Sequence, residues 1–82
     1  MKLYSRRKSN MKDRIVPTAP IERLIRAAGA HRVSAAASET LAKHLEEYGI
    51  EVASRANSLA IHAKRTTVKR EDIEEALKQM KR

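Results

Sequence analysis

The chain has 82 residues, no cysteine and a formal net charge of +8. A chain of this size forms at most one domain with a marginal core, and without cysteine it has neither disulfide bonds nor thiolate metal sites. Eighteen lysines and arginines against ten aspartates and glutamates predict a polyanionic partner, and the absence of a long apolar run argues against a membrane span or a secretory signal.

Residues 1–16 are polar and basic, and their apolar residues follow no helical or strand period. We therefore predict a disordered N-terminal tail over this range. It is either a tail that attracts phosphates or a solubilising extension, since Met11 could also begin a chain. Under the first interpretation the phosphate-binding side chains are Arg6, Arg7, Lys8, Lys12 and Arg14.

The first predicted helix is short. Thr18 is a candidate N-terminal cap, Pro20 fits a first helical turn, and Gly29 suits the left-handed position after the last turn. Of the cations on its outer face, Arg23 lies near the helix N-terminus, where backbone N–H groups favour a phosphate, whereas Arg26 fits a solvated charged face. The apolar residues recur at helical spacing and are Ile21, Leu24, Ile25 and Ala28.

The second predicted helix runs unbroken from Ser34 to Ala63, about 29 residues or ~43 Å. It begins with a capping serine, contains no proline and is rich in alanine. A helix that is apolar on two sides should be covered on both, and one short chain cannot supply that cover, so we predict an obligate oligomer. The large apolar residues form one stripe, Leu41, Leu45, Tyr48, Val52 and Leu59, with Ile50 and Ile61 roughly opposite.

Two basic connectors flank the long helix, residues 30–33 before it and residues 64–69 after it. The second connector carries three cations, two hydroxyl groups and one β-branched apolar residue, which suits a brief extended segment. The last helix is predicted over residues 70–80, with acidic residues in its early turns, where the helix dipole favours them. Its apolar face consists of Ile73, Ala76, Leu77 and Met80.

The sequence shows no sign of an enzyme. His31, His44 and His62 are too far apart for a metal-binding or catalytic motif, and the two glycines cannot form a phosphate-binding loop. We therefore expect no catalytic residue, no metal, no cofactor and no small-molecule substrate.

The order of helices, short, long and short, together with the two basic connectors, resembles the histone fold, and residues 17–82 are similar to archaeal histones. The resemblance implies an all-α histone fold over residues 17–82, assembled as an intertwined handshake dimer, with residues 1–16 as an extra basic tail. The stretches that carry it are PTAPIERLIRAAGAHRVS from Pro17, LAKHLEEYG from Leu41 and KRTTVKREDIEEAL from Lys64.

The resemblance also implies a function: a chromatin protein that dimerises, multimerises and wraps and compacts double-stranded DNA on the archaeal chromosome, in the cytoplasm. Arginine in each inward-facing minor groove is how histones hold DNA without reading bases. By resemblance and charge, the DNA-binding residues are Arg23, Arg26, Arg32, Ser34, Arg65, Thr66, Thr67 and Lys69, together with the five tail cations named above.

Further positions are assigned by the same resemblance. Arg65 and Asp72 are expected to pair within the chain, and Leu59, His62 and Asp72 match the place where two archaeal histone dimers meet. Gly29 matches a close approach between turns of an open superhelix of dimers. Ile50, Arg55, Ile61 and Lys64 depart from the residues that relatives more often carry, which leaves this stacking open.

Other functions remain compatible with the sequence alone. The chain could be the histone-fold subunit of a transcription complex, a protein-binding module that needs a different second chain, or a small basic RNA-binding or ribosomal protein. Whether a second histone joins the assembly is also open. A helix-turn-helix repressor is disfavoured by the length of the second helix. A membrane-surface helix is disfavoured because its polar face mixes acidic and basic residues.

Overall fold

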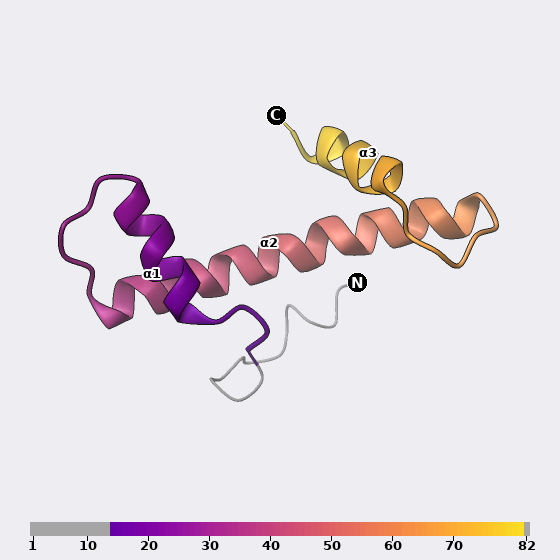
Figure 1. Ribbon diagram of the computed structural model, residues 1–82. Coiled ribbons are helices and arrows are strands. Elements are labelled where there is room, and N and C mark those ends of the chain that lie inside the picture. The colour runs from indigo at the N-terminus through magenta and orange to yellow at the C-terminus, as the bar shows by residue number, and fades with distance from the viewer. Residues whose placement is uncertain (1–13, 82) are drawn as a thin grey trace. The chain divides into compact units, whose positions relative to one another are not determined.

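The computed structural model describes residues 14–81, and within this range three α-helices follow one another without any strand (Figure 1). The helices are α1, Thr18–Ala27, α2, Ala35–His62, and α3, Arg70–Met80. This is the predicted order, so the all-α fold class is confirmed. Of the predicted tail, residues 1–13 lie outside the described range, and the boundary at residue 16 stays a prediction.

The start of α1 differs from the sequence-based expectation. Pro17 is the residue before the helix, with extended backbone at φ −73° and ψ 156°, and no side chain caps this end. Thr18 is already helical, so the prediction that it caps α1 is wrong. Pro20 does lie in the first turn, where its missing N–H leaves no hydrogen bond unmade.

The end of α1 agrees with the prediction. Gly29 has φ +116°, its N–H donates to the carbonyl of Arg26 at 2.9 Å, and the N–H of Ala30 donates to the carbonyl of Ile25 at 3.4 Å. These two bonds form a Schellman motif, which needs a residue with positive φ directly after the helix. Gly29 therefore ends α1 because glycine adopts this backbone conformation without steric cost.

The long helix α2 begins with a hydroxyl cap. The Oγ atom of Ser34 accepts a hydrogen bond from the N–H of Ala37 at 3.0 Å, which satisfies one of the free N–H groups of the first turn. The predicted cap is confirmed. At its other end α2 closes with a second Schellman motif, in which Lys64 takes the position that Gly29 takes after α1.

The described chain divides into two compact units. The first ends at Glu47 and contains α1 and the beginning of α2. Its buried residues are Ile21 of α1 and Ser38 and Ala42 of α2. Apart from Ile21 these are small side chains, so this unit closes only a small apolar core.

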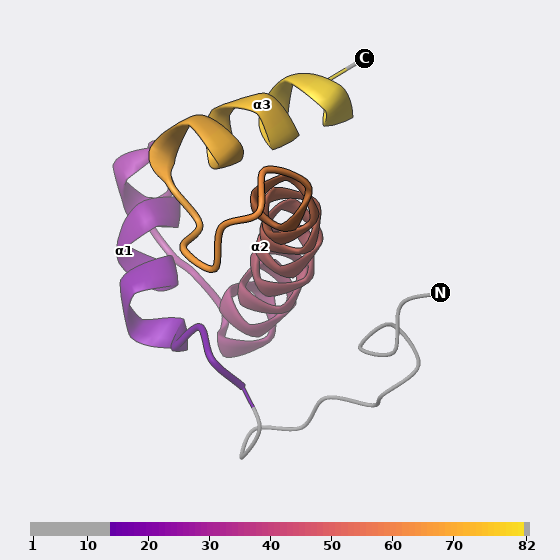
Figure 2. The ribbon, with the colours of Figure 1, turned by 90° about the vertical axis from the view of Figure 1, so that its right-hand side faces the viewer.

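The second unit begins at Tyr48 and contains the rest of α2 and α3. Here α3 crosses the second half of α2 and packs against it (Figure 2). The core consists of three buried residues, Val52, Ala56 and Ala76, with the half-buried Leu59, Ile73 and Met80 packed against them. No large side chain is fully buried anywhere in residues 14–81.

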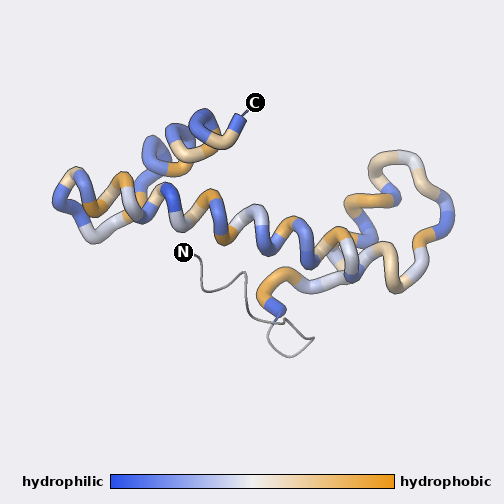
Figure 3. The backbone as a smooth tube through the Cα atoms, turned by 180° about the vertical axis from the view of Figure 1, so that it is seen from behind, coloured by the Kyte–Doolittle hydropathy of each residue, from blue (hydrophilic) through white to orange (hydrophobic). Residues whose placement is uncertain are grey.

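Several large apolar side chains stay at the surface of the single chain. Ile61 is 62% exposed and Tyr48 is 44% exposed, and Leu24, Val68 and Leu77 are exposed as well. Apolar and polar residues alternate along α2 (Figure 3), and none of the described helices is long and apolar enough to cross a membrane. On the second side of α2 the described residues thus leave Ile61 uncovered, whereas Ile50 is half-buried.

Candidate nucleic-acid interface

The predicted DNA-binding residues of the first unit lie on α1 and on the connector before α2. Arg23 and Arg32 are exposed, and no hydrogen bond or ion pair to another described residue holds their side chains. Arg32 and Ser34 line an open hollow together with Ile25, Val33 and Ala37. The two arginines are therefore available to an external anion.

Arg26 is placed differently, because its guanidinium already has partners inside the chain. Its Nη2 atom donates to the carboxylate of Glu22 at 2.9 Å, and its Nη1 atom donates to the carbonyl oxygen of His31 at 2.7 Å. Arg26 thus ties the connector to α1, and Glu22 offsets its charge. A contact between Arg26 and DNA stays a prediction.

The starts of the helices differ in their charge. The first turns of α1 and α2 contain no acidic residue, whereas the first turn of α3 contains Glu71 and Asp72. The free N–H groups and the dipole at a helix N-terminus attract anions. In α3 the chain's own carboxylates supply that negative charge, so only the starts of α1 and α2 keep an uncompensated positive end.

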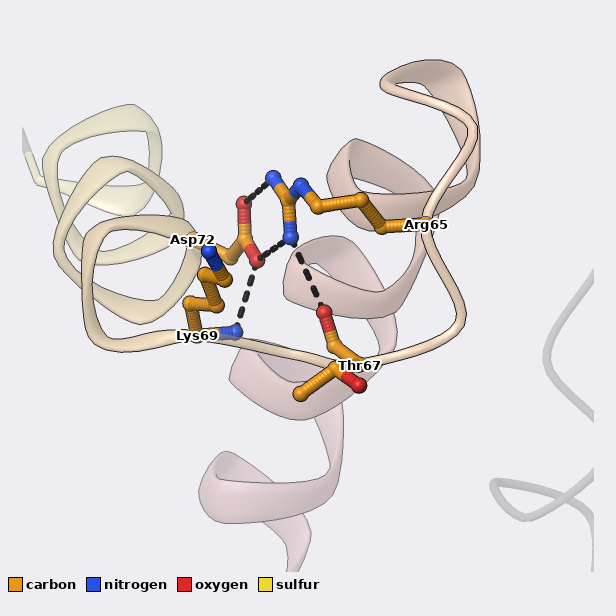
Figure 4. Close-up of polar contacts among 4 residues, drawn as sticks. All are labelled: Arg65, Thr67, Lys69 and Asp72. Atoms are coloured by element: carbon orange, nitrogen blue, oxygen red, sulfur yellow. Dashed lines mark hydrogen bonds and ion pairs between the residues drawn. The ribbon is translucent and has the colours of Figure 1, made fainter.

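In the second unit the connector between α2 and α3 is organised by Arg65 and Asp72 (Figure 4). The Nη1 and Nη2 atoms of Arg65 donate to the Oδ2 and Oδ1 atoms of Asp72 at 2.9 and 3.0 Å. Nη1 also donates to the carbonyl oxygen of Thr67 at 2.9 Å. A planar guanidinium suits this two-point geometry, which lysine cannot reproduce.

Asp72 also caps α3. Its Oδ2 atom accepts the backbone N–H of Lys69, the residue before the helix, at 2.8 Å. The Lys69 side chain has no acceptor atom and cannot return a bond, so only the carboxylate half of a capping box is made. The hydrogen bonds from Arg65, and then from the Lys69 N–H, lower the pKa of Asp72 to about 2, and the same pair raises the pKa of Arg65.

The other predicted DNA contacts of this connector lie at the surface. Thr66, Thr67 and Lys69 are exposed, and the hydroxyl groups of both threonines are free of any hydrogen bond to the described residues. Thr67 uses only its backbone carbonyl, to hold Arg65. The connector thus presents hydroxyl and ammonium groups outwards while Arg65 faces Asp72.

The three residues predicted to join two dimers differ in exposure. Leu59 is half-buried against the core of its own unit, and His62, the last residue of α2, is exposed. Asp72 is only 5% exposed and already accepts three hydrogen bonds. Of the three, His62 is the side chain most available to another molecule, and their joint role stays a prediction.

Gly29, predicted to allow turn-to-turn stacking, has open space beside it. Apart from its chain neighbours, a Cβ atom built at this position would meet no other described residue within 4 Å. The glycine is therefore required by its backbone conformation rather than by crowding within the chain. Stacking at Gly29 stays a prediction.

Besides the bonds of Arg26, sequence reasoning missed a set of contacts between the beginning of the described chain and α2. Glu46 accepts the backbone N–H groups of Ile15 and Val16 with its Oε1 atom, at 2.8 and 3.1 Å. Arg14, predicted to bind DNA, donates from Nη1 to the carbonyl oxygen of Glu39 at 3.1 Å. The other predicted tail contacts, Arg6, Arg7, Lys8 and Lys12, lie outside the described residues.

Comparison with known proteins decides the family. The profile of histone-like transcription factors (CBF/NF-Y) and archaeal histones matches residues 14–77. The chain belongs to this family. It is similar to one subunit of the archaeal histone HAN1 of Thermococcus zilligii, with 57% identity over 63 residues that cover 77% of this chain and 94% of the relative. It is also similar to "Probable archaeal histone 3" of Methanocaldococcus jannaschii, with 49% identity and the same coverage.

Membership in the archaeal histone family indicates the function of these exposed basic residues. The histone fold is a structural, DNA-binding fold, so this chain is a DNA-packaging protein associated with the chromosome. The match includes both connectors, where exposed cations and hydroxyl groups lie. Among the described residues no group of three or more histidines and carboxylates is placed to hold a metal ion.

Proposed function

We propose that two copies of this chain form a handshake dimer that wraps duplex DNA with little preference for sequence. The observation that carries the proposal is the archaeal histone match over residues 14–77. The surface of the single chain supports the dimer, because Leu24, Tyr48 and Leu77 stay exposed while the two cores contain mostly small residues. Covering such apolar area is the main favourable term in protein association.

The charges support the contact with DNA. Arg23 and Arg32 are exposed and unpaired among the described residues, and α1 and α2 begin without acidic residues. Arginines that enter each inward-facing minor groove, about every 10 bp, hold DNA without base-specific bonds. With three such places, at the paired first helices and at each end, one dimer would wrap ~30 bp.

Longer assemblies are part of the proposal. We assign Leu59, His62 and Asp72 to the contact between dimers, and Gly29 to the approach of successive turns. An interface that repeats at both ends of a dimer permits open growth. His62→Ala should then shorten the multimers on DNA, and unchanged multimer sizes after chemical cross-linking would contradict this assignment.

The central experiment is to reconstitute the purified chain alone on long duplex DNA and to digest the complex with a non-specific nuclease. Protected fragments that grow in steps of ~30 bp would support wrapping by an extendable row of dimers. A single protected length would mean a closed particle. No protection at low salt would reject DNA wrapping by this chain alone.

The second candidate function is a histone-fold subunit that needs a different partner chain. The relative from Thermococcus zilligii is named as one subunit of a histone, which favours considering this function, as does a family that includes histone-like transcription factors. The mass of the purified chain in solution separates the two candidates. A homodimer supports the first function, whereas a monomer that associates only with a second chain supports the other.

A further inference from the structure

Lys64 occupies a backbone position that favours glycine. It has φ +61°, and among the described non-glycine residues it is the one with a positive φ. Its N–H donates to the carbonyl of Ile61 at 2.8 Å, and the N–H of Arg65 donates to the carbonyl of Ala60 at 2.9 Å. This is the Schellman motif that ends α1, where Gly29 occupies the equivalent position.

A side chain at this position has a steric cost that glycine avoids, because Cβ approaches the carbonyl oxygen in the left-handed conformation. Glycine would make the same two backbone bonds, so the motif itself gives no reason for lysine. An outlier of this kind points to a role for the side chain. What Lys64 adds is a long stem with a positive charge.

The charges around the second connector indicate what that role is. Arg65 forms an ion pair with Asp72, and the Nε atom of Arg70 lies 3.8 Å from the Oε2 atom of Glu74. Lys64 is exposed, and no ion pair or hydrogen bond joins its ammonium to another residue in the range 14–81. At the turn after α2, Arg65 is therefore paired with Asp72, whereas the ammonium group of the neighbouring Lys64 has no partner in the range 14–81.

We propose that the ammonium group of Lys64 binds a backbone phosphate of DNA at this connector, and that lysine is kept there in spite of its backbone strain. The proposal rests on the DNA-wrapping function proposed above and adds a contact residue to it. Lysine suits the task, since it binds phosphate as a mobile point charge without needing a fixed two-point geometry.

The opposing explanation is that Lys64 stabilises α2 through the helix dipole, which favours a cation near a helix C-terminus. The two explanations predict opposite effects of Lys64→Gly on folding. If strain dominates, this change raises the melting temperature of the DNA-free protein. If the dipole dominates, the melting temperature falls.

The test compares Lys64→Gly with the wild-type protein in DNA affinity measured at several salt concentrations. Losing one phosphate contact should reduce the slope of log affinity against log salt by about 0.9 for each Lys64 lost. We expect this smaller slope together with a higher melting temperature, so weaker binding cannot be ascribed to poorer folding. Lys64→Arg, which keeps the charge, should keep the wild-type slope.

Lys43→Ala is the matched control, because Lys43 is an exposed lysine within α2 and its loss changes the net charge equally. Its salt slope should equal that of the wild type. A wild-type slope for Lys64→Gly, or an equal loss of slope for Lys43→Ala, would overturn the proposed contact while leaving DNA wrapping intact. Wild-type protein that binds no DNA would instead overturn the proposed function and the contact together.

Discussion

Arg65 and Asp72 meet through two parallel hydrogen bonds, 2.9 and 3.0 Å long, that close the connector between the end of α2 and the start of α3. A bond between the Arg65 guanidinium and the carbonyl of Thr67 lies inside this closed segment. The pair therefore fixes the path of the backbone that carries Thr66, Thr67 and Lys69. Its first role is structural, whatever Arg65 contributes to DNA binding.

Arg65→Ala should lower the melting temperature of the DNA-free protein. The substitution leaves the carboxylate of Asp72, a residue that is only 5% exposed, without its charged partner, and an unpaired buried polar group is destabilising. The melting temperature of Arg65→Lys should lie between those of the wild type and Arg65→Ala, because lysine keeps the charge but not the two-point geometry. Thermal unfolding followed by circular dichroism measures both changes, and a wild-type melting temperature for Arg65→Ala would contradict the structural role.

Acid should lower the free energy of unfolding because it protonates Asp72. Its pKa is about 2 in the folded chain, below the ~3.9 of an unfolded aspartate. The folded state therefore gains stability from this carboxylate above pH ~4, and that gain is lost as the pH falls from ~4 towards ~2. Asp72→Asn removes the titrating group and should flatten the pH dependence of unfolding in this window. An unchanged pH dependence would assign the acid sensitivity to other carboxylates.

Of two serines near the start of α2, only one should lose stability on replacement by alanine. Ser34→Ala removes the hydroxyl that accepts the N–H of Ala37 and should cost about 1 kcal/mol of unfolding free energy. Ser38 is 4% exposed, and its Oγ atom makes no hydrogen bond to any residue in the range 14–81. Ser38→Ala removes an unsatisfied buried hydroxyl and should be neutral or stabilising. Urea unfolding compares the two variants. A lower free energy of unfolding for Ser38→Ala would indicate that the Ser38 hydroxyl has a partner outside the described chain.

Glu46 should hold the beginning of the described chain on α2. Glu46→Ala removes the acceptor of the Ile15 and Val16 N–H groups, so both amides should exchange with deuterium faster. The cost in unfolding free energy should be about 1 kcal/mol for the lost bonds. Glu46→Gln keeps an acceptor oxygen and should retain much of the protection. Equal exchange rates in all three proteins would show that these bonds are not maintained in solution.

Gly29→Ala should destabilise the chain by about 1–2 kcal/mol, the usual cost of a left-handed conformation for an L-residue. Because nothing lies within 4 Å of the added Cβ, backbone strain is the whole effect within the chain. Gly29→Asn should cost less, since asparagine tolerates positive φ better than alanine. Urea unfolding checks the order glycine, asparagine, alanine, and equal stabilities would contradict it.

The helices were predictable from the sequence because their signals are local. The stripe and the capping Ser34 place α2 within one residue of its observed ends, and α3 matches the predicted range. Thr18 failed as a cap because helical geometry already begins at that residue, after an extended Pro17. A cap and the first helical residue differ by one position, and composition alone does not separate them.

The candidate site was predictable only in part. The Arg65–Asp72 pair follows from the resemblance to archaeal histones, but nothing in the pattern shows that Arg26 is held by Glu22 and His31. Glu46 could not be found, because its partners are backbone N–H groups 30 and 31 positions away. The positive φ of Lys64 was hidden as well, since sequence signals for a Schellman motif rely on glycine.

Tyr48 gives the protein a spectroscopic property that follows from its composition and exposure. It is the one tyrosine in the range 14–81, and the whole sequence contains no tryptophan or phenylalanine. The residue is 44% exposed, so covering its ring would change its fluorescence and its near-ultraviolet circular dichroism. With Tyr4→Phe, every tyrosine signal would come from this ring, and association could be followed without any label.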